Sequence, residues 1–476
     1  MRGSVWARRR RISRIPRLAI TKRTPNTQLK ALIDEKRLPY ETVAHMVRLV
    51  AAESGESLRT NRSTVEHWIS GSRPAGNTPR YLAEALSRLL GRLVTVDHLG
   101  LSACGGEDDS IGLSLGPDPV ETVTLIGKAD VNRRRFLAAS ACSVAAAALP
   151  LEYVRDMAGR AAAARSGAIA GDAEVAAVRD MVQVFTAMDE LHGGQHGRSA
   201  LVQYLMSDVA TLCRGRFRND DARRQMLSAA ASGVHLAGWK SYDAGEQGLA
   251  QRYYLQSYAL ATESGVPGHD GFVMRTMSQQ GMKIHRAEHC LALAETGLDR
   301  VKGHVDPATE ALFHITQAHA LAKTGQRQQA VRAVERVRAR LDAAKGDPTP
   351  FWARAWGPVE ATVRSRTAKV FATLGDPHNA AQQYAMAAAS RPPGTYARII
   401  ALDLVAQAEL QAGQGAIEQA CTTWGRAMDH MDGVASVRTR KAVKNMRRDL
   451  TRFRARGLRC AADLDERARD FLTAHR

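Results

Sequence analysis

The chain has 476 residues, which is too long for one hydrophobic core and predicts two or three domains. Its hydrophobic content of 45% is that of a globular protein, whereas aromatic residues make up only 5%. The formal net charge is +19, and residues 1–100 hold 19 Lys or Arg against 8 Asp or Glu, so +11 of that charge lies in about a fifth of the chain. This excess favours a polyanionic partner, with nucleic acid as the first choice.

Cysteine usage restricts the compartment and the metal chemistry. The six cysteines stand at positions 104, 142, 213, 290, 421 and 460, without a C-x-x-C pair or a matching histidine spacing. We therefore expect a reducing compartment and no zinc finger.

Residues 1–25 form a basic arm. Residues 1–23 hold nine Lys or Arg, and the first acidic residue is Asp34. Such a run cannot build a core, so we predict a disordered arm that reaches phosphates or a minor groove. A start codon assigned too far upstream is the alternative. No apolar run follows the charges, which argues against a secretory signal.

Residues 26–101 carry the pattern of a small helical DNA-binding domain. Amphipathic periodicity, polar N-caps and turn residues divide this stretch into short helices, and a proline stands where the second should start. The third of them is polar outside and apolar inside, which favours a helix-turn-helix domain. The five predicted helices are Leu29–Leu38, Glu41–Gly55, Asn61–Gly71, Tyr81–Gly91 and a short one from Thr95 to Leu101.

The third helix has the features of a recognition helix. Asn61 is an N-cap residue, Gly71 ends the helix, and Val65, Trp68 and Ile69 recur at helical spacing as an inward stripe. The residues left on the outer face are Arg62, Ser63, Glu66 and His67. A solvated helix face without ligand is the alternative interpretation.

The cap, the run Arg-Ser-Thr-Val, the tryptophan, the glycine and the following Arg-Pro resemble the phage-repressor-like (Xre-type) helix-turn-helix. The whole chain is similar to actinobacterial regulators that join such a domain to a tetratricopeptide array. The link ESGESLRTN is longer than the turn of the phage repressors, and the glutamine that often opens helix two is missing. The resemblance implies contacts to double-stranded DNA from Arg62, Ser63, Thr64, Glu66, His67 and Arg73.

Two connecting segments follow. Residues 102–131, which begin with Gly, Ser and acidic residues, are predicted to be a linker. Residues 132–172 combine Arg133–Arg135 with an alanine-rich run and resemble a twin-arginine export signal. The segment lies behind a whole domain, its apolar run is too short to span a bilayer, and no extracellular cysteine framework follows. We therefore predict a connecting helix and retention in the cytoplasm, with export as the alternative.

Residues 173–476 are predicted to be helical throughout, with helices that recur in pairs. From about residue 228 to 432 they resemble tetratricopeptide repeats, which place a small residue where paired helices touch and a large apolar residue four positions later. Such an array implies a groove for a peptide, a protein or a second subunit, including a homodimer. The four aligned units are Gly245, Ala250 and Tyr254; Gly325, Ala330 and Val334; Gly375, Ala380 and Tyr384; and Ala420, Trp424 and Ala427 behind a stretched turn, with a weaker unit around Ala287, Leu291 and Ala294.

Two histidine motifs suggest metal chemistry. His285–His289 matches H-x-x-E-H, but it falls inside a repeat unit and has no third ligand in a motif. We predict a turn at His192–His196, because its glycines allow the backbone to bend there. No nucleophile elbow, phosphate-binding loop or dinucleotide fingerprint is present in the sequence. We expect no enzyme activity, no cofactor and no metal.

These patterns predict an all-α protein: a helix-turn-helix domain, a linker and a tetratricopeptide-like α-solenoid. We expect a cytoplasmic, DNA-binding transcription regulator without a membrane segment. A scaffold or adaptor that does not bind DNA is the competing class, and an exported protein is the third.

Overall fold

The computed structural model describes residues 24–53, 56–90, 94–101, 112–113, 115, 117–134, 169–282, 287–344, 346, 348–392 and 394–474. They fall into two compact units, an N-terminal unit within residues 1–109 and a C-terminal unit within residues 110–476. The predicted all-α class is confirmed, because the strands of the described residues are only the two-residue β1 (Ile169–Ala170) and β2 (Arg216–Phe217), which pair in parallel.

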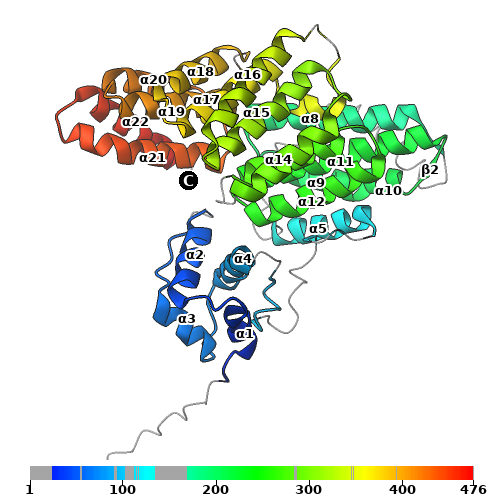
Figure 1. The fold of residues 1–476 in the computed structure, drawn as a ribbon, viewed down its shortest axis with the longest axis horizontal. Helices are drawn as coiled ribbons and strands as arrows, with labels where there is room; N and C mark the ends of the chain where they lie inside the picture. The colour runs from blue at the N-terminus through cyan, green and yellow to red at the C-terminus, as the bar shows by residue number, and fades with distance from the viewer. Residues whose placement is uncertain are drawn as a thin grey trace, which may run out of the picture. The chain divides into compact units, whose positions relative to one another are not determined.

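The N-terminal unit is built from four helices around its own core (Figure 1). They are α1 (Thr27–Glu35), α2 (Tyr40–Glu53), α3 (Arg62–Ile69) and α4 (Thr78–Leu90). The predicted fifth helix is instead a turn over residues 96–100. Thr95 still caps it, since its hydroxyl accepts from the backbone N–H of His98 at 3.3 Å, and Gly100, with φ of 64°, ends the turn before a helix can continue.

The C-terminal unit begins earlier than the sequence suggests. Helix α5 (Pro119–Arg134) begins in the predicted linker 102–131 and ends three residues beyond it, and it packs Val123 and Ile126 into the core of this unit. Its buried Asp130 binds the Nη2 of Arg198 at 2.7 Å and the hydroxyl of Tyr253 at 3.1 Å. A linker would need neither contact, so the predicted linker must end before Pro119. Residues 135–168 of the segment that resembles an export signal are not among the described residues.

Helix α8 (Asp172–His192) follows α5 and is not part of a hairpin. After it the chain forms a short bent segment and then a series of helical hairpins (Figure 1). The bent segment comprises α9 (Arg198–Tyr204), the π-turn η2 (Leu205–Val209) and α10 (Ala210–Cys213). The hairpins are α11 (Asp220–Asp243) with α12 (Gln247–Ser264), α13 (His269–Gly281) with α14 (Ala287–Val301), α15 (Pro307–Lys323) with α16 (Arg327–Asp342), α17 (Val359–Thr373) with α18 (Pro377–Ala389), α19 (Ala397–Gly413) with α20 (Ile417–Asp429), and α21 (Val437–Arg454) with α22 (Arg459–Ala474); the 3-10 turn η3 (Phe351–Trp356) precedes α17.

Four of these hairpins turn through the same glycine cap. At Gly245, Gly325, Gly375 and Gly415 the φ angle lies between 77° and 85°, the left-handed region that favours glycine. The residue after each glycine donates its N–H to a carbonyl five positions back at 2.9 to 3.0 Å, which closes a Schellman motif. The turn predicted to be stretched in the fourth unit is therefore the same turn, with Gly415 five residues before Ala420.

The alanines that follow these turns are fully buried. Ala250, Ala330, Ala380 and Ala420 each have 0% exposure, so only a methyl group fits where the two helices meet. The large side chain one turn later is also buried in every case, as Tyr254, Val334, Tyr384 and Trp424. The hairpins continue past the predicted limit of residue 432, because α21 and α22 add their own buried residues to the last core cluster.

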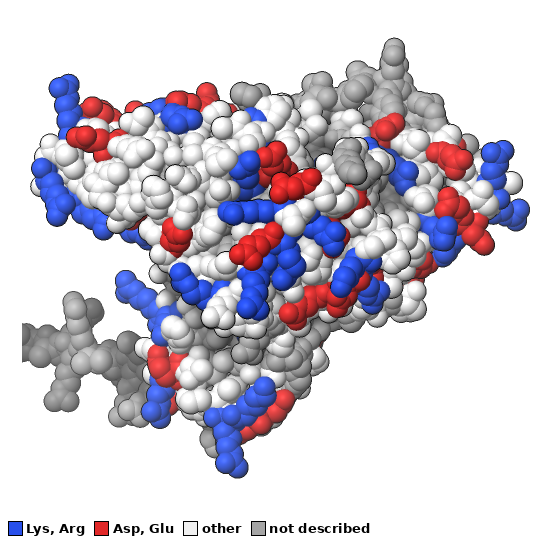
Figure 2. Space-filling model, turned by 45° about the horizontal axis from the view of Figure 1, so that its top comes forward, with Lys and Arg blue, Asp and Glu red and all other residues white. Residues whose placement is uncertain are grey.

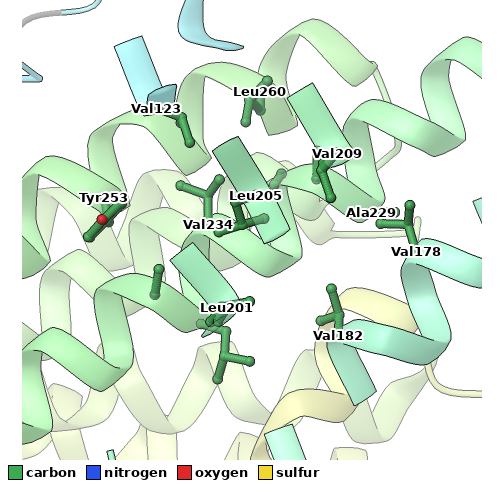
Figure 3. Packing of buried hydrophobic residues seen from close by; sticks show 14 of the residues in the cluster. Val123, Val178, Val182, Leu201, Leu205, Val209, Ala229, Val234, Tyr253 and Leu260 are labelled. Carbon is green, nitrogen blue, oxygen red and sulfur yellow. The ribbon is translucent and has the colours of Figure 1, made fainter. Parts of the chain in front are cut away.

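The first part of the C-terminal unit packs α5, α8, α9, α11 and α12 around one apolar cluster. Figure 3 shows side chains from these helices converging, among them Val123, Val182, Leu201, Val234 and Leu260. Gly233 allows a close approach, because a Cβ there would lie 2.8 Å from a methyl of Leu205 in η2. This cluster joins the segments before the hairpins to the first hairpin.

A buried charge network joins α8 to helices far along the chain. Asp189 accepts from the Nη2 of Arg398 at 2.6 Å and from the indole Nε1 of Trp239 at 3.0 Å, and it lies 3.4 Å from the Nζ of Lys240. Burial alone would raise the pKa of Asp189, but Arg398 and Lys240 outweigh it and lower the pKa. Helix α8 is thereby fixed against both α11 and α19.

The neighbouring Glu190 behaves differently. Burial raises its pKa to about 7, because Arg398 is 3.6 Å away and offsets the loss of solvent only in part. Asp243 completes the network, since its carboxylate lies 3.4 Å from Arg398 and 3.5 Å from Arg438. The pKa values of the two adjacent carboxylates therefore shift in opposite directions, because Arg398 and Lys240 both stabilise the charge of Asp189, whereas burial and the charges of Asp189 and Asp243 oppose that of Glu190.

Replacing a turn glycine should destabilise the C-terminal unit by backbone strain alone. Gly375 has φ of 77° and open space where a Cβ would lie, so Gly375→Ala should cost about 1–2 kcal/mol. Gly425 lies inside α20 with equally open space, and Gly425→Ala should stabilise by about 0.5–1 kcal/mol. Urea unfolding of the full chain, followed by circular dichroism, measures both changes. Equal effects of the two substitutions would contradict the assignment of the strain to the turn.

Two buried histidines should make the unit less stable in acid. Burial lowers the pKa values of His235 and His269 to about 3, and each ring nitrogen faces a hydroxyl, Thr276 at 3.0 Å and Ser228 at 2.9 Å. Because the unfolded chain takes up protons below about pH 6.5 that the folded chain excludes, stability present above pH 6.5 should be lost as the pH falls towards 3.

The expected slope is about 1.4 kcal/mol per pH unit for each histidine. Urea unfolding of the parent and of His235→Gln at pH 6 and pH 5 measures it, and the variant should show the shallower loss. His304→Gln, at an exposed turn of the same unit, serves as the control and should keep the parent's slope. A His235→Gln slope equal to the parent's would refute the explanation.

Candidate nucleic-acid interface

The N-terminus of α3 is fixed by a capping box. The side-chain oxygen of Asn61 accepts from the backbone N–H of Thr64 at 2.9 Å, and the Thr64 hydroxyl accepts from the backbone N–H of Asn61 at 3.3 Å. Two N–H groups that the first helical turn would leave unpaired are thus satisfied. The predicted cap at Asn61 is therefore present, and the helix starts at Arg62.

The inner face of α3 anchors it to the core. Val65 is fully buried and Trp68 is 5% exposed, and they pack in the cluster formed with α1, α2 and α4. Gly71, with φ of 102°, ends the helix as predicted. The apolar stripe thus fixes the rotation of α3 about its axis and determines which residues face solvent.

Asn26 joins three segments of this unit. Its side-chain oxygen caps α1 through the N–H of Leu29 at 2.9 Å, and its amide nitrogen donates to the carbonyl of Leu99 at 2.7 Å. Its backbone N–H donates to the carbonyl of Ile69 at the end of α3, at 2.8 Å. The start of the unit, the end of α3 and the last turn therefore depend on one asparagine, which the sequence identifies only as a polar residue before a helix.

The outer face of α3 presents four of the predicted DNA-contacting residues. Arg62, Ser63, Glu66 and His67 are exposed, and Arg73 is exposed in the segment after the helix. Thr64 is half-buried, and its hydroxyl also donates to Asn61, so it serves the cap. As DNA contacts, all six residues remain predictions.

Arg62 in the first turn of α3 forms an ion pair with Glu66. The Nε of Arg62 lies 2.8 Å from a carboxylate oxygen of Glu66, one helical turn away, and 74% of the arginine side chain is exposed. A pair at this exposure adds only about 0.3–0.5 kcal/mol, so it can be exchanged for another partner at little cost. The guanidinium retains its Nη groups for an acceptor outside the chain.

Glu41 and Arg48 connect α2 to the start of α3, a role that the sequence analysis did not assign. Glu41 accepts from the backbone N–H of Arg62 at 3.2 Å and from the Nη2 of Arg48 at 3.1 Å. Arg48 also donates to the carbonyl of Thr60. The spacing of seven between Glu41 and Arg48, two turns of one helix face, is the only local signal for the pair. The long α2–α3 link is thereby fixed at its second end.

Charge on the surface is mixed. Figure 2 shows Lys and Arg interspersed with Asp and Glu over the face in view. The nine basic residues of the predicted arm lie outside the described residues. The described part of the N-terminal unit therefore offers individual cations, such as Arg62 and Arg73, for phosphate or base contacts.

The structure describes the first of the two histidine motifs in full and the second only in part. The rings of His192 and His196 lie 4.7 Å apart around a turn at Gly193, where φ is 88° and a Cβ would meet the carbonyl oxygen of Ala435 at 2.5 Å. The glycine is thus required by close backbone packing. The match His285–His289 falls partly outside the described residues, because His285 is not among them. Within the described ranges, no group of three His, Cys, Asp or Glu is arranged to hold a metal ion.

A family model described as the SP15 N-terminal domain matches residues 29–102. The matched segment coincides with α1 to α4 and the following turn, the same stretch that forms an independent core. A search of curated proteins finds no match for the chain. Each helix in the described ranges is too short or too polar to cross a membrane.

Truncating the core tryptophan should unfold the N-terminal unit. Trp68→Ala removes a buried indole and should cost about 3–5 kcal/mol, a large share of the stability of so small a unit. His67→Ala, the adjacent exposed position, should change stability by less than about 0.5 kcal/mol. Thermal melting of residues 1–109 compares the two. If the Trp68→Ala unit melts at the same temperature as the parent unit, the indole does not contribute to the core.

Proposed function

We propose that the chain is a cytoplasmic transcription regulator that binds double-stranded DNA through α3. The observation that carries the proposal is a capped helix whose outer face is exposed while its inner face is fixed on an independent core. A recognition helix needs this arrangement, because base-reading side chains must be presented rigidly to the major groove. Asn26, Glu41 and Trp68 supply the rigidity from three directions.

In this proposal the two kinds of contact have separate roles. Arg62, Ser63 and His67 read base edges, because they stand on the first two turns of α3. Arg73 and the basic arm of residues 1–25 neutralise phosphates, which supplies affinity without sequence preference. The Arg62–Glu66 pair would be exchanged on binding, since an exposed pair is held by little free energy.

The hairpins of the C-terminal unit support a tetratricopeptide-like α-solenoid as the second half of the regulator. Repeated glycine caps and fully buried alanines make successive hairpins nearly equivalent, and stacking of equivalent hairpins produces a continuous surface. We propose that this surface binds a peptide, a protein or a second copy of the chain. Helix α8 already covers part of α11 and α19, so the partner would use the remaining face.

A non-DNA-binding adaptor is the second candidate, and two acidic groups favour it. The carboxylate of Glu41 occupies the N-terminus of α3, where a phosphate would otherwise be attracted. Glu66 engages Arg62 in the same region. These charges would suit a basic protein partner better than a phosphate backbone.

Replacing Arg62 should separate the two candidates. Arg62→Ala in the full chain should weaken binding to a preferred DNA site by about 1–3 kcal/mol and change binding to random DNA little. The control Arg332→Ala removes the same charge from an exposed position on α16 and should leave both affinities unchanged. Fluorescence anisotropy on a site selected from random sequence provides the measurement.

Deleting residues 1–23 completes the test at two salt concentrations. Loss of the arm should weaken binding to both DNAs and reduce the salt dependence, because fewer counterions are released. Failure to select any sequence, with Arg62→Ala binding as the parent does, would favour the adaptor.

A further inference from the structure

The C-terminal unit contains a polar pocket between α14, α15 and α16 that neither the DNA proposal nor the peptide proposal uses. Its volume is about 580 Å³, within the range of roughly 300–1,000 Å³ that small-molecule sites occupy. Side chains from two turns of α15 form its floor, and residues from the end of the second hairpin and from α16 form its walls. The polar residues that line it are Asp299, Lys302, Glu310, His314, Gln317, Arg336 and Arg340.

Two hydrogen-bond acceptors on the floor lack a partner among the described residues. The Nε2 of His314 faces Glu310 at 3.3 Å, and the carboxylate of Glu310 also lies 3.2 Å from Arg340. The other ring nitrogen, Nδ1, is buried and has no hydrogen-bond partner among the described residues, and the whole residue is only 8% exposed. The Oε1 of Gln317 is buried and unpaired in the same way. A buried acceptor without a donor costs about 1–3 kcal/mol, so an occupant that donates there would be favoured.

The protonation of His314 fits this role. Burial lowers its pKa, and the opposing effect of Glu310 does not restore it. The imidazole is therefore neutral near pH 7. With the Nε2 proton directed at Glu310, Nδ1 is left as a hydrogen-bond acceptor.

The rim of the pocket is positively charged. Lys302 and Arg336 are exposed and have no ion-pair partner in the described part of the chain, and Arg340 shares Glu310 with His314. With Asp299 and Glu310 as the lining carboxylates, three cations face two anions. An oxyanion at the rim would therefore complete the charge balance, and the planar guanidinium of Arg336 can bind it through two N–H groups.

We propose that this pocket binds a small oxyanion that also carries hydroxyl groups. The anionic group contacts Lys302 and Arg336, and the hydroxyls donate to Nδ1 of His314 and Oε1 of Gln317. Apolar contact is limited to Leu298 and Ala339, so an apolar ligand would leave these acceptors and charges unpaired. A phosphate ester and a carboxylate both supply the required chemistry.

Calorimetric titration of the full chain, without DNA, tests the site and distinguishes the two sources. Ribose 5-phosphate and gluconate are the two hydroxylated oxyanions, whereas inorganic phosphate supplies the charge alone and ribose the hydroxyls alone. At least one of the first two should bind saturably, and at least about tenfold more tightly than either partial probe. The one that binds identifies the oxyanion. Because no DNA is present, the result is independent of the proposed regulator function.

Three variants assign the binding to the pocket. Arg336→Gln should weaken it at least about tenfold through the oxyanion, and Gln317→Leu should weaken it through the lost acceptor. Arg332→Gln is the matched control, an exposed arginine one turn earlier on α16 that does not line the pocket, and it should bind as the parent does.

Absence of saturable binding to both hydroxylated probes would overturn the proposal. Equal weakening by Arg332→Gln and Arg336→Gln would do so as well, because it would reveal general attraction of anions to a basic protein. The proposal would also be overturned if ribose 5-phosphate bound no more tightly than inorganic phosphate and Gln317→Leu left that binding unchanged. This outcome counts only if the Gln317→Leu variant melts at the same temperature as the parent.

Discussion

The buried guanidinium of Arg398 is the contact on which the arrangement of the C-terminal unit depends. It binds Asp189 of α8 across 209 positions of sequence and lies between Asp243 and Glu190. A fully buried arginine is tolerated only because these carboxylates replace its hydration, and they raise its pKa above the ordinary value. The stack of Arg398 and Arg438 on the ring of Trp239 adds apolar contact to the same charges. Apolar packing has no preferred direction, whereas the bonds from Asp189 to Arg398 and Trp239 do, so they determine where α8 lies against α11 and α19.

The N-terminal unit uses smaller polar contacts for the same purpose. Its core is formed by Val65, Trp68 and their neighbours, but apolar side chains alone do not determine where α3 begins or how the chain enters α1. Asn26 and Glu41 make hydrogen bonds to the backbone of other segments, and those bonds have defined directions. In both units apolar burial supplies stability, while a few directional polar groups select one arrangement.

The sequence predicted what is local and missed what is distant. The cap at Asn61, the stop at Gly71 and the spacing of Gly245 to Ala250 depend on residues within one or two turns, so their patterns are visible along the chain. The bond from Asn26 to Leu99 and the pair of Asp189 with Arg398 join residues that no periodicity relates. Helix α5 was missed because glycine and acidic residues precede it and its own pattern is weakly amphipathic. The acceptors of His314 and Gln317 could not be found either, since their burial depends on how α16 packs over α15.

The turn at Gly193 has a consequence for folding kinetics. Its backbone packs against Ala435, whose N–H donates to the carbonyl of His192 at 2.8 Å, so a segment before the first hairpin is fastened to the loop before the last one. In an open stack each hairpin contacts only its neighbours, and folding can spread from any point. Here a turn before the first hairpin is bonded to the loop before the last one, and this contact between distant residues raises the contact order. The entropy of closing so long a loop must be overcome before the contact can form. The hairpin α21–α22, synthesised after the other hairpins, is therefore needed before the earliest helices of this unit can complete their contacts.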